Sequence, residues 1–157
     1  MHHTIDPVYN SHSNVLILGT FPSVKSREQH FFYAHPQNRF WKVIATLTKT
    51  PLPTTVEAKK AMLLANHIAL WDVIQSCEIT GSSDSSIKNV VPTDFTNLLE
   101  QSNIQHIYAN GAMAHKLYQT YCEATTHRPI IKLPSTSPAN AACSLETLIN
   151  AWSIITQ

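Results

Sequence analysis

Apolar residues occur along this chain in two patterns, short continuous runs and runs with helical spacing. A continuous apolar run is typical of a strand that is buried on both faces of a sheet. Continuous runs span residues 15–18 and 68–71, and the mainly apolar segments 104–109 and 129–133 are also interpreted as strands. They predict four strands, separated along the chain by the segments with helical spacing.

In the segments between the runs, apolar residues recur three or four positions apart. Phe40, Ile44 and Leu47 give residues 38–49 one apolar face, which predicts an amphipathic helix. Thr55 is a suitable N-cap for a second helix. Further segments are predicted as a long loop before residue 38, a serine-rich loop over 76–92, and helices from Pro92–Asp94 onward, after Gly111 and over 145–152.

Strands that alternate with amphipathic helices predict an α/β fold with a mostly parallel sheet. No internal repeat or linker divides the chain, so residues 1–157 are expected to form a single domain. The predicted architecture is a three-layer α/β/α sandwich with a central, mostly parallel four-stranded sheet.

A distinctive motif follows each predicted strand. In a parallel sheet, ligands bind in the crevice beyond the carboxyl ends of the strands. Because the motifs all fall at that edge, they indicate a functional site there without identifying its chemistry. The motifs are Gly19–Ser23, Trp71-Asp72, Asn110-Gly111 and Pro134–Pro138.

The composition limits the class of protein and its location. Hydrophobic residues make up 43% of the chain and charged residues 13%, as expected of a globular protein without a disordered tract. No apolar run approaches the ~18 residues that a membrane span requires. The first residues lack the basic and apolar pattern of a secretion signal. We therefore expect a cytoplasmic protein with no membrane partner.

Neither the cysteines nor the histidines have the spacing of a metal site. Cys77, Cys122 and Cys143 lie far apart and form no C-x-x-C pair, and the nine histidines form no H-E-x-x-H motif. No metal and no cofactor is therefore predicted. The net charge of +1 gives no global basic field for a nucleic acid, although a local patch can contact phosphates. The candidates for such a patch are Lys25, Arg27, Arg39 and Lys42.

Taken together, motifs spread over nearly the whole chain resemble one enzyme family. They are Leu18–Ser23 with Ser26, Phe32–Trp41, Leu70–Val73, Gly81–Ile87, Asn110-Gly111 and Leu133–Asn140. This set resembles the uracil-DNA glycosylase superfamily, and most closely its branch of hypoxanthine-DNA (deoxyinosine) glycosylases. The segment His35–Trp41 also looks like the mismatch-specific uracil-DNA glycosylases.

The resemblance implies an enzyme that takes a base out of the DNA stack and hydrolyses its glycosidic bond without a metal. It places Tyr33 against the flipped base, with Phe21 nearby as a second base-binding ring; either ring could instead only pack the loop. It also suggests that Asn110 reads the base edge with its amide donor and acceptor. The alternative for Asn110 is a left-handed turn before Gly111.

The catalytic residue is expected to be Asn38. Many superfamily members carry Asp or Asn in the first motif, where this chain has Phe21. The resemblance moves the role to Asn38, which would orient water, and the alternative is that Asn38 caps the following helix. Asp72 is expected to fix the loops, because an unpaired carboxylate would repel DNA phosphates, and the alternative is a second polarising group.

The resemblance also implies contacts between DNA phosphates and hydroxyl-bearing residues of the loops, chiefly the loop between Pro134 and Pro138. The alternative for the loop between Pro134 and Pro138 is an ordinary capped turn. The candidates are Ser23, Ser135, Thr136 and Ser137, with less support for Ser82, Ser83 and Ser86.

The sequence thus predicts a monomeric, monofunctional deoxyinosine glycosylase that acts on DNA containing a deaminated base. It would leave an abasic site for downstream abasic-site repair enzymes. One alternative is a uracil or mismatch-specific glycosylase. The other is a catalytically silent protein that binds damaged DNA, which the presence of Phe21 in the first motif motivates.

Overall fold

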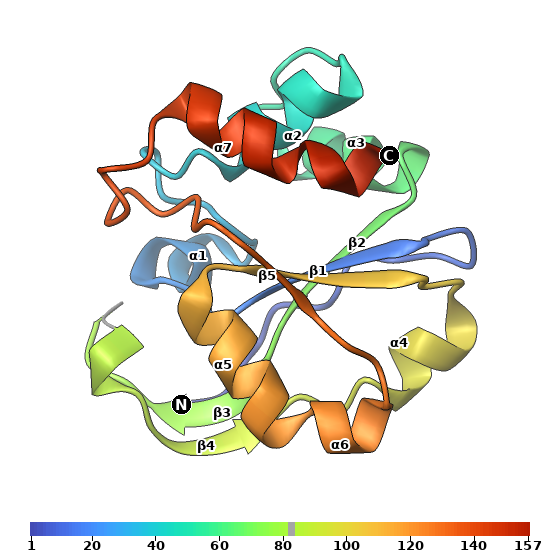
Figure 1. The fold of residues 1–157 in the computed structure, drawn as a ribbon. Coiled ribbons are helices and arrows are strands. Elements are labelled where there is room, and N and C mark those ends of the chain that lie inside the picture. Colours follow the sequence, from blue (N-terminus) through green and yellow to red (C-terminus); the bar gives the residue numbers. More distant parts are fainter. Residues whose placement is uncertain (82–83) are drawn as a thin grey trace.

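A parallel sheet of four strands forms the middle of the molecule, in a computed structural model that describes residues 1–81 and 84–157 (Figure 1). The strands lie in the order β2-β1-β5-β6 and every pairing is parallel, so all four end at the same edge. This confirms the predicted sheet. The strands are β1 (Val15–Gly19), β2 (Ile68–Asp72), β5 (His106–Asn110) and β6 (Ile131–Leu133).

Helices cover both faces of the sheet, which confirms the three-layer sandwich (Figure 1). Side chains alternate between the faces of a strand, so Ile17 packs in one core while Leu16 and Leu18 pack in the other. The helices on the Ile17 face are α2 (Phe40–Thr48), α3 (Val56–Ala65) and α7 (Leu145–Trp152), followed by the 3-10 turn η2 (Ser153–Thr156). Those on the other face are α4 (Thr96–Gln101), α5 (Ala112–Tyr121) and α6 (Glu123–Thr126).

The loop predicted over residues 76–92 was wrong at both ends, because residues 76–78 and 88–92 belong to the strands of an antiparallel hairpin. Its strands are β3 (Ile74–Glu78) and β4 (Lys88–Pro92), with a 3-10 turn η1 (Asp84–Ser86) between them. The start of the chain pairs with β3, since the His3 amide donates to the Gln75 carbonyl oxygen at 2.7 Å and the Cys77 amide to that of Met1 at 2.9 Å. Because the start of the chain and β3 are far apart in sequence, no local residue pattern predicts their pairing.

The long loop predicted before residue 38 contains a short helix, α1 (Val24–Gln29). Only Ser26 is buried in this helix, so it carries no apolar stripe that would predict it. Helix α2 begins at Phe40, with Arg39 as N-cap, slightly later than predicted. Thr55 caps α3 as predicted, and its hydroxyl oxygen accepts from the Ala58 amide at 3.1 Å. None of the helices in the described part of the chain combines the length and apolar character that crossing a membrane requires.

Candidate active site at the carboxyl edge of the sheet

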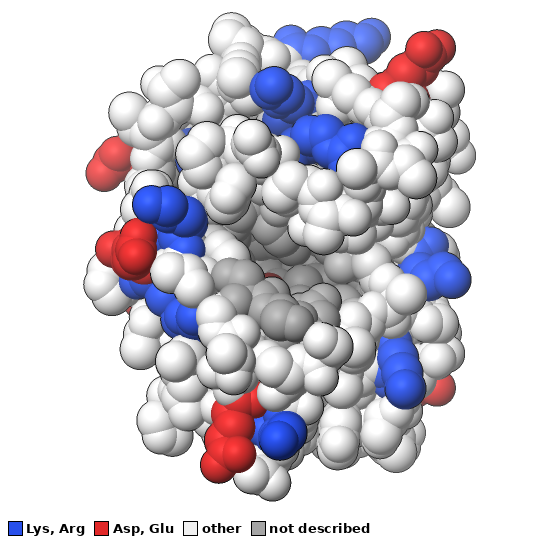
Figure 2. All heavy atoms as spheres, turned by 90° about the vertical axis from the view of Figure 1, so that its left-hand side faces the viewer, with Lys and Arg blue, Asp and Glu red and all other residues white. Residues whose placement is uncertain are grey.

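The carboxyl ends of the strands face the viewer in Figure 2, and this face of the molecule is hollowed in its middle. Most of the surface around the hollow is neither basic nor acidic, and Lys and Arg side chains are scattered around it (Figure 2). The residues that the sequence singled out after each strand therefore lie at a recessed and largely uncharged face.

Three of these residues form a chain of hydrogen bonds. Asn110 ends β5, Thr136 follows β6, and Asn38 precedes α2. The Asn110 Nδ2 donates to Thr136 Oγ1 at 3.0 Å, and the Thr136 hydroxyl donates to Asn38 Oδ1 at 2.9 Å. The Thr136 amide donates to Asn110 Oδ1 at 3.0 Å, which closes a ring between these two residues.

Burial and backbone geometry bear on the turn proposed as an alternative for Asn110 and on the phosphate contact predicted for Thr136. Asn110 is 9% exposed and has no positive φ, so the left-handed turn falls on Gly111, whose φ is +98°. A Cβ at Gly111 would lie 3.1 Å from that of Ser135, which brings the two motifs together. Thr136 is 0% exposed, so its hydroxyl does not reach the surface, contrary to the predicted phosphate contact.

Asn38 serves the helix start and the hydrogen-bond chain at once. It lies one position before the N-cap Arg39, and its Oδ1 accepts from the Phe40 amide at 2.9 Å. The predicted capping contact is therefore present, although Asn38 is not the N-cap itself. Its side chain is half-buried, and its Nδ2 makes no hydrogen bond to any described residue.

Tyr33 is held in an unusual backbone conformation, with φ at +51°. Its ring stacks on the fully buried ring of Phe40, with centroids 4.2 Å apart and planes at 24°. The hydroxyl is buried and makes no well-aligned hydrogen bond to a described residue. Burial and the nearby Asp72 carboxylate raise the pKa of this hydroxyl well above its usual range, and the adjacent Asn110 amide only partly opposes them.

Gly19 allows Tyr33 and Asp72 to meet at the end of β1. A Cβ at this position would lie 2.5 Å from Asp72 Oδ1 and 2.8 Å from the Tyr33 oxygen. Any side chain here would therefore displace both groups. The glycine of the first motif is required by this close approach.

Asp72 is buried at 3% exposure and is paired with a residue that the sequence did not indicate. His3 Nε2 lies 2.8 Å from Asp72 Oδ2. The Ile5 amide donates to His3 Nδ1 at 3.2 Å, so the ring proton sits on Nε2 and is donated to the carboxylate. This pairing agrees with a structural role for Asp72. His3 lies 69 positions away, and no local signal could have identified it.

The remaining predicted residues lie along the same edge. Phe21 is half-buried, edge-on to the His3 ring at 5.9 Å, with the Arg27 guanidinium 5.8 Å from its ring centre. The Ser23 hydroxyl oxygen accepts from the Ser26 amide at 3.2 Å and so caps α1. Neither contact excludes a further contact with DNA, because both side chains are partly exposed.

The loop after β6 is a capped turn whose two serines are partly exposed. Ser135 Oγ accepts from the Ser137 amide and Ser137 Oγ from the Ala139 amide, each at 3.1 Å. Ser86 accepts from the Thr80 amide at 2.9 Å. The candidates Ser82 and Ser83 lie outside the described residues.

The Arg39 side chain stabilises the loop after β6. Its guanidinium donates to the carbonyl oxygens of Ser137 at 3.2 Å and Asn140 at 3.0 Å, and also to that of Cys143. These bonds engage a cation that the sequence suggested for a phosphate-binding patch. Its position indicates a clamp on the loop.

Metal-ligating residues do not gather at this edge. Among the described residues, no group of three or more His, Cys, Asp or Glu side chains is placed to hold a metal. Cys77, Cys122 and Cys143 are free thiols, and burial raises the pKa of Cys122 to about 11. A thiol in this state is a poor nucleophile and metal ligand.

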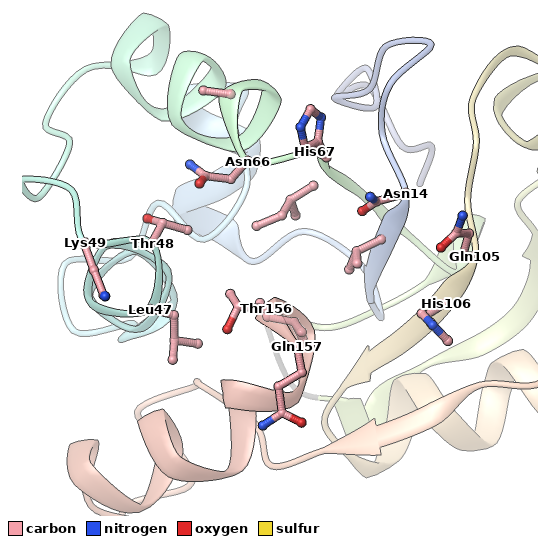
Figure 3. A pocket seen from close by; sticks show the side chains of 14 residues that line it. Asn14, Leu47, Thr48, Lys49, Asn66, His67, Gln105, His106, Thr156 and Gln157 are labelled. Carbon is pink, nitrogen blue, oxygen red and sulfur yellow. The ribbon is translucent and has the colours of Figure 1, made fainter.

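A cavity of about 530 Å³ lies at the opposite edge, where β1, β2 and β5 begin (Figure 3). Amides, imidazoles and one lysine line it, and it contains no residue of the hydrogen-bond chain. It is therefore not the candidate active site. Its labelled polar residues are Asn14, Thr48, Lys49, Asn66, His67, Gln105, His106, Thr156 and Gln157.

Comparison with known proteins agrees with this architecture. The family model described as the uracil DNA glycosylase superfamily matches residues 7–155, and the chain belongs to this superfamily. The resemblance of its motifs is thereby confirmed.

Two curated relatives come from Methanosarcina and are both named hypoxanthine DNA glycosylase. The one from Methanosarcina barkeri is 29% identical over 148 residues, covering 93% of this chain and 92% of the relative. The one from Methanosarcina acetivorans is 32% identical over 135 residues, covering 85% and 84%. A solution NMR structure of a candidate uracil DNA glycosylase from Methanosarcina acetivorans superposes with a TM-score of 0.84 at 28% identity, covering 99% of this chain and 96% of the other.

Proposed function

We propose that this protein is a monofunctional DNA glycosylase that excises hypoxanthine from deoxyinosine in DNA and leaves an abasic site. The observation that carries this proposal is that both curated relatives, each matched over most of both chains, are named hypoxanthine DNA glycosylase. The recessed carboxyl edge of the sheet supports it, because a flipped base needs a fitted pocket.

In the reaction the C1′–N9 bond breaks and its electron pair leaves with the base. The oxygen of a water molecule bonds to C1′, and the proton that this water loses balances the one that the base gains. The chemistry needs a surface that stacks the base, hydrogen bonds that favour charge on the departing base, and access for water. None of these requires a metal.

We assign stacking to Tyr33 and base reading to Asn110. The Tyr33 ring is braced from behind by Phe40, which gives the base a rigid face, and such stacking contributes ~1–3 kcal/mol per base. After its bonds to Thr136, Asn110 retains one N–H and one acceptor lone pair. One donor and one acceptor match the O6 and N1–H of hypoxanthine. Phe21 would form the side of the same pocket.

We assign phosphate contacts to Ser23, Ser135 and Ser137, whose partly exposed hydroxyls lie at the same edge. Hydroxyls and backbone amides can position a phosphate without adding charge. We also propose that the protein acts as a monomer in the cytoplasm and passes its abasic product to downstream abasic-site repair enzymes.

A uracil or mismatch-specific glycosylase is the second candidate. The structural similarity to a candidate uracil DNA glycosylase favours it, because the Asn110 amide would also match the N3–H and O4 of uracil. A catalytically silent binder of damaged DNA remains the third, since Phe21 stands where many superfamily members carry Asp or Asn.

The first experiment is excision from end-labelled duplexes that carry one deoxyinosine or one deoxyuridine, without magnesium. Hot alkali then reveals abasic sites. We expect cleavage at deoxyinosine by the wild-type protein and a loss of at least ~100-fold in Asn38→Ala, the size typical of removing one catalytic group. Cleavage only at deoxyuridine would select the second candidate. DNA binding without cleavage of either duplex would select the third.

A further inference from the structure

The hydrogen-bond chain at the carboxyl edge has a fixed direction, because backbone N–H groups can only donate. The Thr136 amide donates to one end of the Asn110 carboxamide, so that end is Oδ1 and the other is Nδ2. The Asn110 Nδ2 must then donate to the Thr136 hydroxyl, whose own proton is left for Asn38. The Phe40 amide also points at Asn38 and confirms that the accepting atom is Oδ1.

This direction determines what Asn38 can offer to a substrate. Its Oδ1 accepts from both the Phe40 amide and the Thr136 hydroxyl, each at 2.9 Å, so both of its lone pairs are engaged. The Nδ2 carries two N–H groups and makes no hydrogen bond to any described residue. The side chain is half-buried, so the polar group that it leaves for the DNA is a donor.

We propose that Thr136 is a positioning residue that fixes Asn38 with its amide NH₂ group toward the substrate, so that Asn38 acts as a hydrogen-bond donor to the departing base. This inference rests on the proposed glycosylase function and changes the expected role of Asn38. A residue that activates water must accept a proton or hydrogen bond from it, and Asn38 Oδ1 has no lone pair left for that.

A donor at this place suits the step in which the C1′–N9 bond breaks. The electron pair of that bond moves onto the purine, whose oxygen and ring nitrogens become better acceptors. A pre-oriented donor stabilises this charge as it develops, and it does so without reorganisation during the reaction. Water then adds to a sugar cation that needs little nucleophilic help.

Thr136 is suited to positioning and not to DNA contact. It is 0% exposed, and two backbone bonds hold it independently of its hydroxyl: its amide donates to Asn110 Oδ1, and its carbonyl oxygen accepts from the Arg39 amide at 3.1 Å. Replacing the hydroxyl with a methyl group therefore breaks only the hydrogen-bond chain from Asn110 through Thr136 to Asn38, which acts as a relay between the two asparagines.

The first test compares Thr136→Val with Thr136→Ser under single-turnover conditions at saturating enzyme. Thr136→Val, which keeps the side-chain shape, should slow hypoxanthine release by about 10- to 100-fold, with the DNA dissociation constant within about 3-fold of wild type. Thr136→Ser restores the hydroxyl and should restore the rate to within about 3-fold. A Thr136→Val rate equal to wild type, or a loss that follows a loss of DNA affinity, would overturn the proposal.

Thr93→Val is the matched control. Thr93 is also buried at this edge, at 5% exposure, and its hydroxyl donates to the Asp72 carbonyl oxygen at 2.8 Å outside the relay. Thr93→Val should lower the melting temperature by about as much as Thr136→Val does, while its excision rate stays near that of the wild-type protein. An equal loss of rate in both variants would assign the effect to general destabilisation and contradict the proposal.

The second test is Asn38→Asp, which keeps the inward oxygen and replaces the NH₂ donor with an acceptor. Both contacts that orient the side chain can persist, so the variant is expected to fold. If Asn38 works as a donor, Asn38→Asp should be as slow as Asn38→Ala at saturating enzyme. A rate at or above wild type would show that an acceptor serves the reaction and would overturn the proposal.

The proposed function and this inference fail in different ways. Release of uracil but not hypoxanthine by the wild-type protein would refute the proposed substrate, and the same variants would then test the relay on deoxyuridine. If the wild-type protein releases neither base, both proposals fail. A normal wild-type reaction that is unaffected in Thr136→Val refutes the relay alone.

Discussion

Tyr33 combines a ring placed for stacking with a hydroxyl that the fold accommodates poorly. The ring lies against Phe40, while the hydroxyl is buried without a well-aligned hydrogen bond to a described residue. An unsatisfied buried hydroxyl costs ~1–3 kcal/mol, so this group does not serve stability. Its position between Gly19, Asp72 and Asn110 makes it a candidate contact for the base.

Tyr33→Phe should therefore raise the free energy of unfolding, or leave it unchanged, while it lowers hypoxanthine release. The ring stack on Phe40 is retained, and only the hydroxyl is lost. Chemical denaturation and single-turnover excision measure the two effects. Tyr33→Ala is the control for stacking and should be less stable and less active. A Tyr33→Phe variant that is destabilised by more than ~1 kcal/mol would mean that the hydroxyl is satisfied in the folded protein.

The same hydroxyl predicts how stability depends on alkaline pH. Its pKa is raised in the folded protein by burial and by Asp72, so the folded state holds the proton more tightly than the unfolded state. Below the unfolded pKa of about 10 this group adds no pH dependence to the stability, and above it the folded state loses stability as the pH rises, because only the unfolded state then releases the proton. Melting curves from pH 8 to 11 should show a smaller decrease in melting temperature with rising pH in Tyr33→Phe than in wild type. Parallel curves would contradict this.

At the scale of elements, the loop after β6 is shaped by residues outside it. Arg39 donates to three of its carbonyl oxygens, and the Trp152 indole N–H in α7 donates to the Pro134 carbonyl oxygen at 2.9 Å. These contacts hold Ser135 and Ser137 at the recessed face. The start of α2 and the end of α7 therefore set the position of a loop that neither contains.

Arg39→Lys should distinguish two roles of this side chain, stabilisation of the loop by its guanidinium and contact of its charge with a DNA phosphate. A lysine keeps the charge but cannot reproduce the planar fork that reaches several carbonyl oxygens. We expect Arg39→Lys to behave like Arg39→Ala, with faster amide hydrogen exchange over residues 135–143 and a melting temperature lower by several degrees. If Arg39→Lys instead matches wild type while Arg39→Ala loses DNA affinity, the side chain acts through its charge.

At the scale of the whole molecule, the low net charge predicts a moderate contribution of charge to DNA binding. The net charge is +1 and the rim of the hollow is mostly uncharged (Figure 2). The salt dependence of binding reports the number of phosphates that cations neutralise, with a slope of about −0.9 for each on duplex DNA.

We expect the logarithm of the binding constant to fall with a slope of about −2 to −4 against the logarithm of salt concentration. Fluorescence anisotropy between 50 and 200 mM salt measures this slope on a deoxyinosine duplex. A slope near −8 would indicate a larger basic footprint than the described surface shows. An undamaged duplex of the same length is the control for binding that does not depend on the base.

The predicted strands and most of the helices were correct because their signals are local. The buried run in β1 and the Thr55 cap of α3 each act within a few residues. The hairpin of β3 and β4 was missed because the start of the chain supplies its remaining partner. Helix α1 was missed because it buries a single residue.

Local patterns in the sequence are sufficient to predict the layered architecture and the edge of the sheet at which the candidate site lies, because parallel strands with motifs at their ends place those motifs together. The orientation of the candidate site residues depends on contacts that form only in the folded chain. Asn38 and Thr136 lie 98 positions apart, Asn110 and Thr136 lie 26 apart, and His3 and Asp72 lie 69 apart. The direction of a hydrogen bond depends on which donor faces which acceptor after folding. No residue pattern along the chain records that choice.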